Sequence, residues 1–211
     1  MIIAVDGPTA SGKGTIARAL AAHFGLPHLD TGLLYRAVGR QVALAGGNPD
    51  DPADALAACG FADSLLADPA LRDEAVGGLA SRVSVHAAVR AALLARQRSF
   101  AAQPGGAVLD GRDIGTVIAP DADAKLFVTA SVAARALRRY LEMRARGEDV
   151  SRAAIESDLA ARDARDRDRT LAPLRQAADA VLLDTSALPP AAAIAAAIAL
   201  VERQRNTRVD T

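Results

Sequence analysis

Short apolar runs recur along the chain and alternate with longer alanine-rich segments. The clearest run, IIAVD at residues 2–6, is β-branched and apolar up to its last residue, which is typical of a strand buried on both faces of a sheet. Similar runs occur at 107–110, 125–130 and 180–185, and a weaker one at 26–30. The pattern therefore predicts five strands.

The segments between these runs have helical character. They cover residues 13–24, 32–45, 85–103, 131–146, 151–168 and 189–204. Strands that alternate with helices form a parallel sheet with helices on both faces. The order of elements therefore predicts an α/β fold with a parallel five-stranded sheet flanked by helices.

Two regions depart from this alternation. Residues 46–84 contain many glycine and proline breakers and are expected to form loops and short helices, without strands. Residues 131–175 are expected to form a helix, a break at Gly147 and a second, highly charged helix. Insertions on α/β cores commonly carry substrate contacts. We therefore expect one domain over 1–211 whose core carries both insertions.

In this division the core consists of residues 1–45, 85–130 and 176–211, the acceptor-binding insertion is about 46–84, and a helical lid is about 131–175. The length of 211 residues and the 51% hydrophobic content suit a single compact domain. The sequence shows no internal repeat.

Composition narrows the range of partners. The formal net charge is zero and only 3% of residues are aromatic, which disfavours binding to nucleic acid or to an anionic membrane. The N-terminus lacks the features of a signal peptide, and the alanine-rich runs fall short of a membrane span. We expect a cytoplasmic monomer. The single cysteine, Cys59, lacks a nearby base and is expected to be structural.

The segment GPTASGKGT joins the first strand to the first helix and fits the phosphate-loop pattern G-x-x-x-x-G-K. Its backbone N–H groups and the helix N-terminus suit a phosphate, and Lys13 can reach the outer phosphates of a nucleotide. The expected ATP-binding residues of the loop are Gly7, Pro8, Thr9, Ala10, Ser11, Gly12, Lys13, Gly14 and Thr15. This loop makes the predicted fold one of the P-loop NTPase type.

The loop departs from the commonest form at one position. Gly14 occupies the place of the usual serine or threonine after the lysine, and Thr15 follows it. The hydroxyl that normally helps to hold Mg²⁺ is therefore displaced, and we expect the ion to rest mainly on phosphate oxygens and water. Thr15 and Asp110 are candidate indirect ligands, although a structural role for Asp110 is equally compatible with the sequence.

A phosphate loop by itself fits switches, motors and kinases. The Asn-Lys-x-Asp motif of a guanine-binding switch is absent from the sequence, and motor or transporter ATPases are more often longer and oligomeric. A small chain with two charged insertions indicates a kinase that acts on a small molecule.

Six motifs occur in an order that resembles one family across nearly the whole chain. They are GPTASGKGT, LDTGLLYR, ASRVS with VRAALLARQR, DGRDIGT, KLFVTAS and RDARDRDRTLAPL. The sequence resembles bacterial cytidylate kinases, members of the P-loop nucleoside monophosphate kinase family. The last three motifs separate this family from adenylate, guanylate and shikimate kinases. One departure is the span 46–80, which lacks the β-hairpin-rich insertion of many members and leaves the tightness of the base pocket open.

The resemblance gives the acceptor site, and the chemistry of its residues agrees. Arg36 and Arg112 are forked donors suited to the acceptor's phosphate, and Thr31 can present a hydroxyl beside them. Arg112 stands in DGRDIGT between two acids, where we expect it to hold that phosphate opposite the donor. The implied acceptor-binding residues are Thr31, Arg36, Ser81, Arg90, Gly111, Arg112, Asp113, Asp166 and Arg169.

The resemblance further implies that Ser81, Arg90 and Asp113 read the base. A carboxylate at Asp113 accepts a hydrogen bond from the exocyclic amine of cytosine, whereas uracil places a carbonyl oxygen there. Arg90 can donate to the ring and keep Asp113 ionised. An unmet buried polar group disfavours UMP by about ten- to hundredfold.

The charged helix supplies the remaining groups. Helical spacing places Arg162, Arg165, Asp166 and Arg169 on one face. By resemblance, Asp166 meets the acceptor's ribose while Arg162 and Arg169 neutralise phosphates as the lid closes. Asp163 and Arg167 lie on another face, where the spacing favours a solvent-exposed ion pair. On the preceding helix, Arg138 and Arg139 are weaker candidates for contact with ATP.

The implied activity is ATP-dependent phosphorylation of CMP, and of dCMP, by direct in-line transfer with Mg²⁺. The expected catalytic residues are Lys13, Arg112, Arg162 and Arg169. The acceptor phosphate is already anionic, so no strong general base is needed, and His23, His28 and His86 are expected to be structural. Two alternatives stay open at this point: a kinase for UMP or a shikimate-like alcohol, and a nucleotide-dependent switch.

Overall fold

The structure, a computed structural model, describes residues 1–209. It divides into two compact units. The first contains residues 1–29 together with the chain from Ala101 onward, and the second contains Asp30–Phe100. The expected division into a core, an acceptor-binding insertion and a lid stays a prediction.

The sheet follows the predicted strands. Its strands are β1 Ile2–Asp6, β2 His28–Asp30, β3 Ala107–Gly111, β4 Ala124–Thr129 and β5 Val181–Asp184, arranged in the order β2-β3-β1-β4-β5. The pairings of β1 with β3, β1 with β4 and β4 with β5 are parallel, which confirms the predicted parallel sheet. Asp6, the last residue of β1, is in register with Gly111 of β3, so the loops that follow the two strands start side by side.

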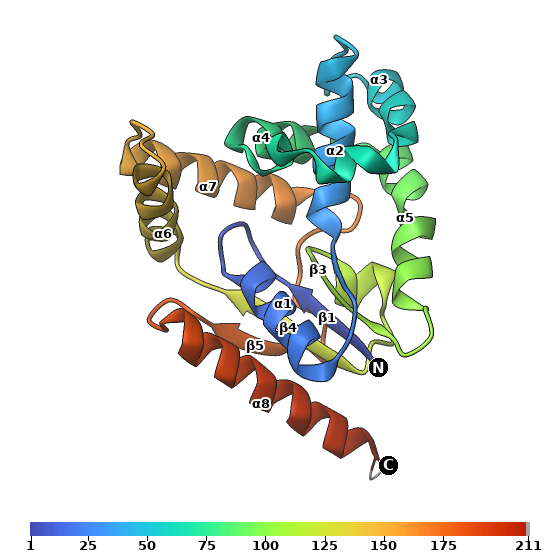
Figure 1. Cartoon of the computed structure of the whole chain (residues 1–211), viewed down its shortest axis with the longest axis vertical. Helices are drawn as coiled ribbons and strands as arrows, with labels where there is room; N and C mark the ends of the chain where they lie inside the picture. Colours follow the sequence, from blue (N-terminus) through green and yellow to red (C-terminus); the bar gives the residue numbers. More distant parts are fainter. Residues whose placement is uncertain (210–211) are drawn as a thin grey trace. The chain divides into compact units, whose positions relative to one another are not determined.

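Two helices pack on the sheet in the first unit. Helix α1 spans Lys13–Phe24 and α8 spans Pro190–Val209, and Figure 1 shows both beside the strands. Their apolar faces form a core with the strands that includes Ile3, Val5, Ile16, Leu20, Val108, Leu126, Val128, Ala197 and Val201. The β1 run is buried except at its start because both faces of the central strand are covered.

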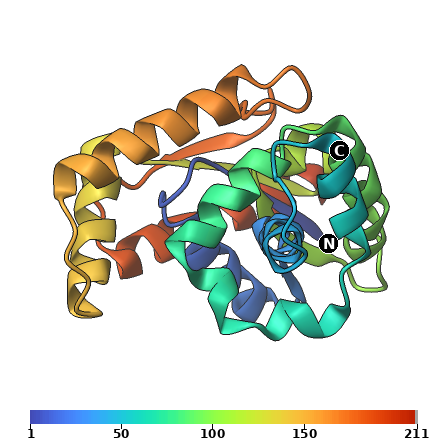
Figure 2. The ribbon, with the colours of Figure 1, turned by 90° about the horizontal axis from the view of Figure 1, so that it is seen from above.

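The same unit carries a helical pair between β4 and β5. Helix α6 spans Val132–Ala145 and α7 spans Arg152–Asp168, with Gly147 in the turn between them, as predicted. Ser131 and Ser151 cap the two helices by accepting from the N–H groups of Ala134 and Ala154. Figure 2 shows this pair in yellow and orange. A short π-helical turn, η4 Ile114–Ile118, follows β3.

The second unit consists mainly of helices. It contains α2 Thr31–Leu44, α3 Pro52–Ala57, α4 Glu74–Val83 and most of α5 Ala87–Ala101, with short 3₁₀ turns η1 Ala58–Gly60, η2 Asp63–Ala67 and η3 Pro69–Arg72. Residues 46–84 form helices and loops without a strand, as the breakers predicted.

Local contacts in the second unit account for two residues that were expected to be structural. Cys59 donates to the carbonyl of Ala55 at 3.5 Å, and burial raises the pKa of its thiol, which disfavours the reactive thiolate. The Nε2 atom of His86 lies 2.9 Å from the carbonyl oxygen of Pro49 and ties the start of α5 to the loop before α3.

Candidate active site

The loop between β1 and α1 has the backbone of a phosphate cradle. A Cβ at Gly7 would lie 2.0 Å from the carbonyl oxygen of Val128, so only glycine fits where the loop leaves the sheet. Ala10 and Gly12 have positive φ angles of 62° and 89°, which turn the chain tightly before α1 begins at Lys13. No side-chain hydrogen bond caps α1 at Gly12, and the N-terminus of a helix that lacks such a cap suits an anion.

Arg112 lies beside this loop. Its Nη2 donates to Oγ1 of Thr9 at 2.6 Å, and its Nε donates to Oδ2 of Asp166 in α7 at 2.8 Å. The arginine that follows β3 is therefore joined both to the phosphate loop and to the charged helix. The sequence placed Arg112 near a phosphate; the structure adds the two partners that hold it.

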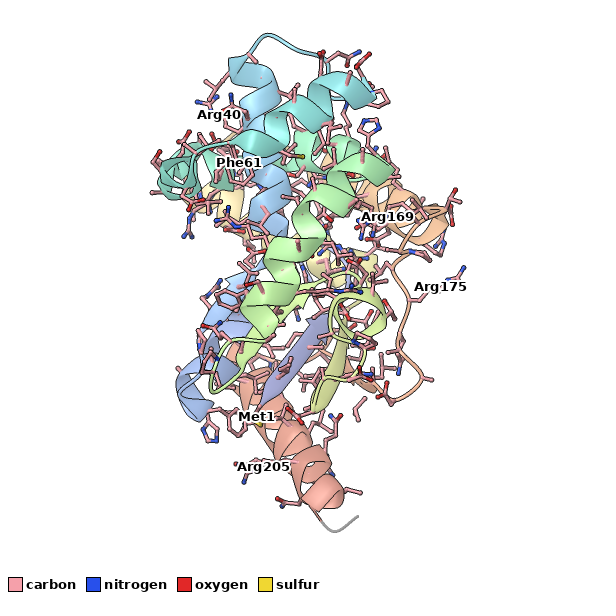
Figure 3. The ribbon with its side chains drawn as sticks, turned by 90° about the vertical axis from the view of Figure 1, so that its right-hand side faces the viewer. Met1, Arg40, Phe61, Arg169, Arg175 and Arg205 are labelled. Carbon is pink, nitrogen blue, oxygen red and sulfur yellow. The ribbon has the colours of Figure 1, made fainter. Side chains whose placement is uncertain are left out.

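The electrostatics of Asp166 show which charges gather there. Burial by itself would raise the pKa of this carboxyl, but Arg112 and Arg169, with a smaller effect from Lys13, lower it below its ordinary value. Arg169 follows the end of α7 (Figure 3). The structure thus brings together Lys13, Arg112, Asp166 and Arg169, four of the residues predicted from sequence.

The remaining residues of α7 lie partly as predicted. Arg162 is buried, and its Nε lies 2.8 Å from Asp158, one turn earlier. Arg165, which the spacing placed on the same face, is exposed.

The expected pair between Asp163 and Arg167 is wrong. Asp163 pairs instead with Arg135 of α6, while Arg167 pairs with Asp168 at 3.1 Å on the surface. Helical spacing allowed the first pair, but the buried guanidinium of Arg135 offers Asp163 a less hydrated and better aligned partner.

The two candidate arginines of α6 have protein partners. Arg138 donates from Nη1 to Oγ1 of Thr185 at 3.1 Å, and Arg139 donates to Glu142 at 3.1 Å. Their contact with ATP stays a prediction.

Asp110 and Thr15 are the two residues predicted to support a metal ion indirectly. The Oδ1 atom of Asp110 is 2.7 Å from Nε2 of His28, and a Cβ at Gly14 would lie 3.7 Å from its other carboxylate oxygen. Thr15 is exposed, with its hydroxyl 3.4 Å from Arg18. No group of three metal-ligating side chains is found within the described residues. Thr15 lies in the first turn of α1, and the carboxylate of Asp110 in β3 lies near Gly14 of the same turn. This placement suits indirect support of an ion held mainly by phosphates.

The second unit contains the other four predicted acceptor residues. Thr31 is buried at the first residue of α2, and Ser81 lies on α4. Arg36 donates from Nη1 to the carbonyls of Leu71 and Asp73 at 2.8 and 2.9 Å, so it also anchors the chain before α4. Arg90 of α5 lies over the ring of Tyr35, 5.6 Å from its centroid.

Comparison with known proteins decides the family. The sequence model of the cytidylate kinase family matches residues 3–203. A cytidylate kinase of Xanthobacter autotrophicus is 60% identical over 209 residues, which cover 99% of this chain and 100% of the relative. Cytidylate kinases of Rhodopseudomonas palustris strain TIE-1 and Methylocella silvestris are each 56% identical, covering 99% and 98% of this chain and 99% and 96% of the relatives. The chain belongs to the cytidylate kinase family.

Membership of the cytidylate kinase family favours a nucleoside monophosphate acceptor over a shikimate-like alcohol, and a kinase over a switch. It also accounts for the combination of a phosphate loop with several clustered arginines, because the enzyme must neutralise two polyanions. Among the described residues, no helix is long and apolar enough to cross a membrane.

Sequence reasoning missed two residues of this cytidylate kinase family member, Asp6 and Arg135. The carboxylate of Asp6 accepts from the N–H groups of Ile114 and Gly115, each at 2.8 Å, and so fixes the chain just after Arg112 and Asp113. The signal for Asp6 was present as an acid that ends an otherwise apolar buried strand. Arg135 carried no comparable signal among the other arginines of its helix.

Asp6 should make stability depend on pH. Burial raises its pKa from 3.8 to about 6, against the lowering effect of its two backbone hydrogen bonds. The folded state therefore holds this proton more tightly than the unfolded state, and the stabilisation present below pH 4 is lost as the pH rises through about 6. Relative to the Asp6→Asn variant, the native protein should lose about 2 kcal/mol of unfolding free energy between pH 4 and pH 7.5.

Urea unfolding of both proteins at the two pH values measures this change. The Asn variant is the appropriate reference because it keeps the shape of the side chain but does not titrate. A stability difference that is the same at both pH values would contradict the assignment.

Proposed function

We propose that the protein transfers the γ-phosphoryl group of ATP to CMP, and to dCMP. A phosphate oxygen of the acceptor attacks the γ-phosphorus while the bond to the β–γ bridging oxygen breaks, giving ADP and the cytidine diphosphate. The observation that carries the proposal is the position of Arg112, bonded to Thr9 of the phosphate loop and to Asp166 of α7. Membership of the cytidylate kinase family supports the choice of acceptor.

The donor would lie in the loop from Gly7 to Thr15. In this assignment the N-terminal N–H groups of α1 bind its β-phosphate, and Lys13 neutralises charge on the outer phosphates. Arg112, Arg162 and Arg169 offset the charge that accumulates when two phosphates meet. Asp166 bonds Arg112 and attracts Arg169, and Asp158 pairs with Arg162, before the substrates arrive. Little reorganisation is therefore needed during transfer.

Three parts of the acceptor need binding groups: its phosphate, its base and its ribose. We assign its phosphate to Arg36 and Arg112. Arg36 is assigned on its motif LDTGLLYR and on its forked guanidinium, and its bonds to the carbonyls of Leu71 and Asp73 also anchor it. We assign its base to Ser81, Arg90 and Asp113 and its ribose to Asp166, with Thr31 and Gly111 lining the same ligand.

Magnesium fits the residues present. The ion would be held by phosphate oxygens and water, with Asp110 and Thr15 as indirect partners at the start of α1. When bound, it supplies positive charge that offsets the negative charge of the phosphates. His28 keeps the carboxylate of Asp110 oriented for that role.

Base selection gives the experiment that tests the function. A coupled assay with ATP should show turnover with CMP and dCMP, with UMP lower by about ten- to hundredfold and with AMP and GMP inactive. In Asp113→Asn the amide can donate to the uracil carbonyl, so kcat/KM for CMP should fall by about tenfold or more and the preference over UMP should shrink or reverse.

The matched control is Asp121→Asn, an exposed acid eight residues further along, which should leave the ratio of CMP to UMP turnover unchanged. Turnover of ATP without dependence on any added monophosphate would overturn the proposed function. An unchanged ratio in Asp113→Asn would overturn the assignment of the base contact only.

A further inference from the structure

Two carbonyl groups of the phosphate loop are held from outside the loop. The carbonyl of Thr9 accepts from Nη1 of Arg135 at 3.0 Å, and the carbonyl of Ser11 lies 3.0 Å from Oγ1 of Thr185. In a trans peptide the N–H of the next residue points opposite to the carbonyl. The two contacts therefore direct the N–H groups of Ala10 and Gly12 away from Arg135 and Thr185.

The loop needs such support. Ala10 has a φ of 62°, a left-handed conformation that is unfavourable for a residue with a Cβ. Strained backbone of this kind persists only where surrounding contacts hold it. Arg135 contacts the carbonyl of Thr9, just before Ala10, and Thr185 contacts the carbonyl of Ser11, just after it.

Arg135 is itself fixed. Its side chain is 3% exposed, and its guanidinium makes hydrogen bonds to the carbonyls of Ala130 and Thr9 and to both carboxylate oxygens of Asp163, the latter at 3.1 and 2.5 Å. The charge of Arg135 is thus matched by Asp163. This arrangement suits a residue that orients the loop and does not neutralise phosphate directly.

Thr185 is fixed in the same way. It is 2% exposed, and its hydroxyl also lies 3.1 Å from the carbonyl of Thr129 and accepts from Arg138. The two arms of the support therefore come from different parts of the first unit. Arg135 reaches the loop from α6, and Thr185 reaches it from the end of β5.

We infer that Arg135, Asp163 and Thr185 are positioning residues that form an outer clamp on the phosphate loop and set the direction of its anion-binding N–H groups. Asp163 also connects the clamp to the site residues of α7, because it directly follows Arg162 and lies one turn before Asp166 on that helix. The inference rests on the proposed function only in that the phosphates of ATP are the ligand of the loop.

Binding of a non-hydrolysable ATP analogue, measured by calorimetry, tests the clamp. Asp163→Asn and Arg135→Lys each lose the paired contacts of the fork, and Thr185→Val loses the hydroxyl. Each should raise the Kd of the analogue by about tenfold, because a buried hydrogen bond to a charged group or to the loop is lost. The Kd of inorganic tripolyphosphate should rise by a similar factor, since the clamp acts on phosphate contacts and not on the base.

Kinetics and a double variant separate positioning from a structural role. The KM for ATP should rise with the Kd, while the KM for CMP stays within about twofold. The double variant Arg135→Lys with Asp163→Asn should lose less than the product of the single effects, since both act through one contact. The matched controls are Asp168→Asn and Arg167→Gln, which remove an exposed ion pair near Asp163 at the end of α7. They should leave the Kd of the analogue and the KM for ATP unchanged.

Two results would overturn the clamp. If the variants melt at lower temperature but bind the analogue as tightly as the native protein, the contacts are only structural. If Asp163→Asn tightens binding, Arg135 contacts the phosphates directly once it is released. Failure of the proposed function would be seen separately, in the assay of the native protein with CMP, because analogue binding needs no acceptor.

Discussion

Replacing Arg112 by alanine is expected to lower kcat for CMP by about 10³-fold or more, while the Kd of a non-hydrolysable ATP analogue stays within about threefold. Arg112 contacts Thr9 through the side-chain hydroxyl, so its removal leaves the backbone cradle of the donor intact. What is lost is a forked cation that is already aligned with both the phosphate loop and α7 before substrate binds. The variant should therefore lose stabilisation of the transition state and keep its affinity for ATP.

The alanine variant also leaves Asp166, a largely buried carboxylate, without its nearest cation, so its Tm should fall. Arg112→Lys keeps the charge and serves as the second variant. A single ammonium cannot span Thr9 and Asp166 as the fork does, so kcat should still drop by about tenfold or more. Arg175→Ala, an exposed arginine after α7 (Figure 3), is the control. Normal turnover in a folded Arg112→Ala protein would refute the assigned role.

Replacing Lys13 by methionine should reduce kcat by about 10²- to 10³-fold and weaken ATP binding as well. Lys13 begins α1 directly after the turn at Gly12. Its positive charge, like that of Arg112, lowers the pKa of Asp166, so the two cations belong to the same cluster. Unlike Arg112, it belongs to the loop that is assigned to the donor. Its loss should therefore raise the Kd of the ATP analogue, and this difference separates the two variants.

The control for Lys13 is Arg18→Met, which removes an exposed cation from the same helix. Steady-state kinetics with varied ATP and varied CMP, together with analogue binding, measure both effects. If Lys13→Met binds the analogue as tightly as the native protein and turns over CMP normally, the loop does not hold the donor phosphates in the assigned way.

The sequence was informative wherever a function depends on consecutive residues. The strand, turn, lysine and helix of the phosphate loop are neighbours in the chain, and the structure confirms their arrangement. The strands and six main helices were predicted to within a few residues because burial on both faces or on one face leaves a clear apolar period. The strand-free character of residues 46–84 followed from their glycine and proline breakers.

The sequence could not show which charged side chains pair with each other or with distant backbone groups. Helical spacing made Arg167 available to Asp163, but it says nothing about Arg135, which lies 28 positions earlier and meets Asp163 only when α6 packs on α7. The role of Asp6 was hidden for the same reason, since its hydrogen bonds reach residues more than a hundred positions away.

The amino-acid sequence by itself determined the parallel α/β fold and the phosphate loop, and it supplied the arginines and acids that are proposed for the site. Only the tertiary structure decided that Arg112 joins Thr9 to Asp166, that Asp163 pairs with Arg135, and that Asp6 fixes the chain after Arg112. The physical reason is that apolar periodicity and loop geometry are local properties. The choice of a buried charge's partner depends on which groups lose their water together when distant elements pack.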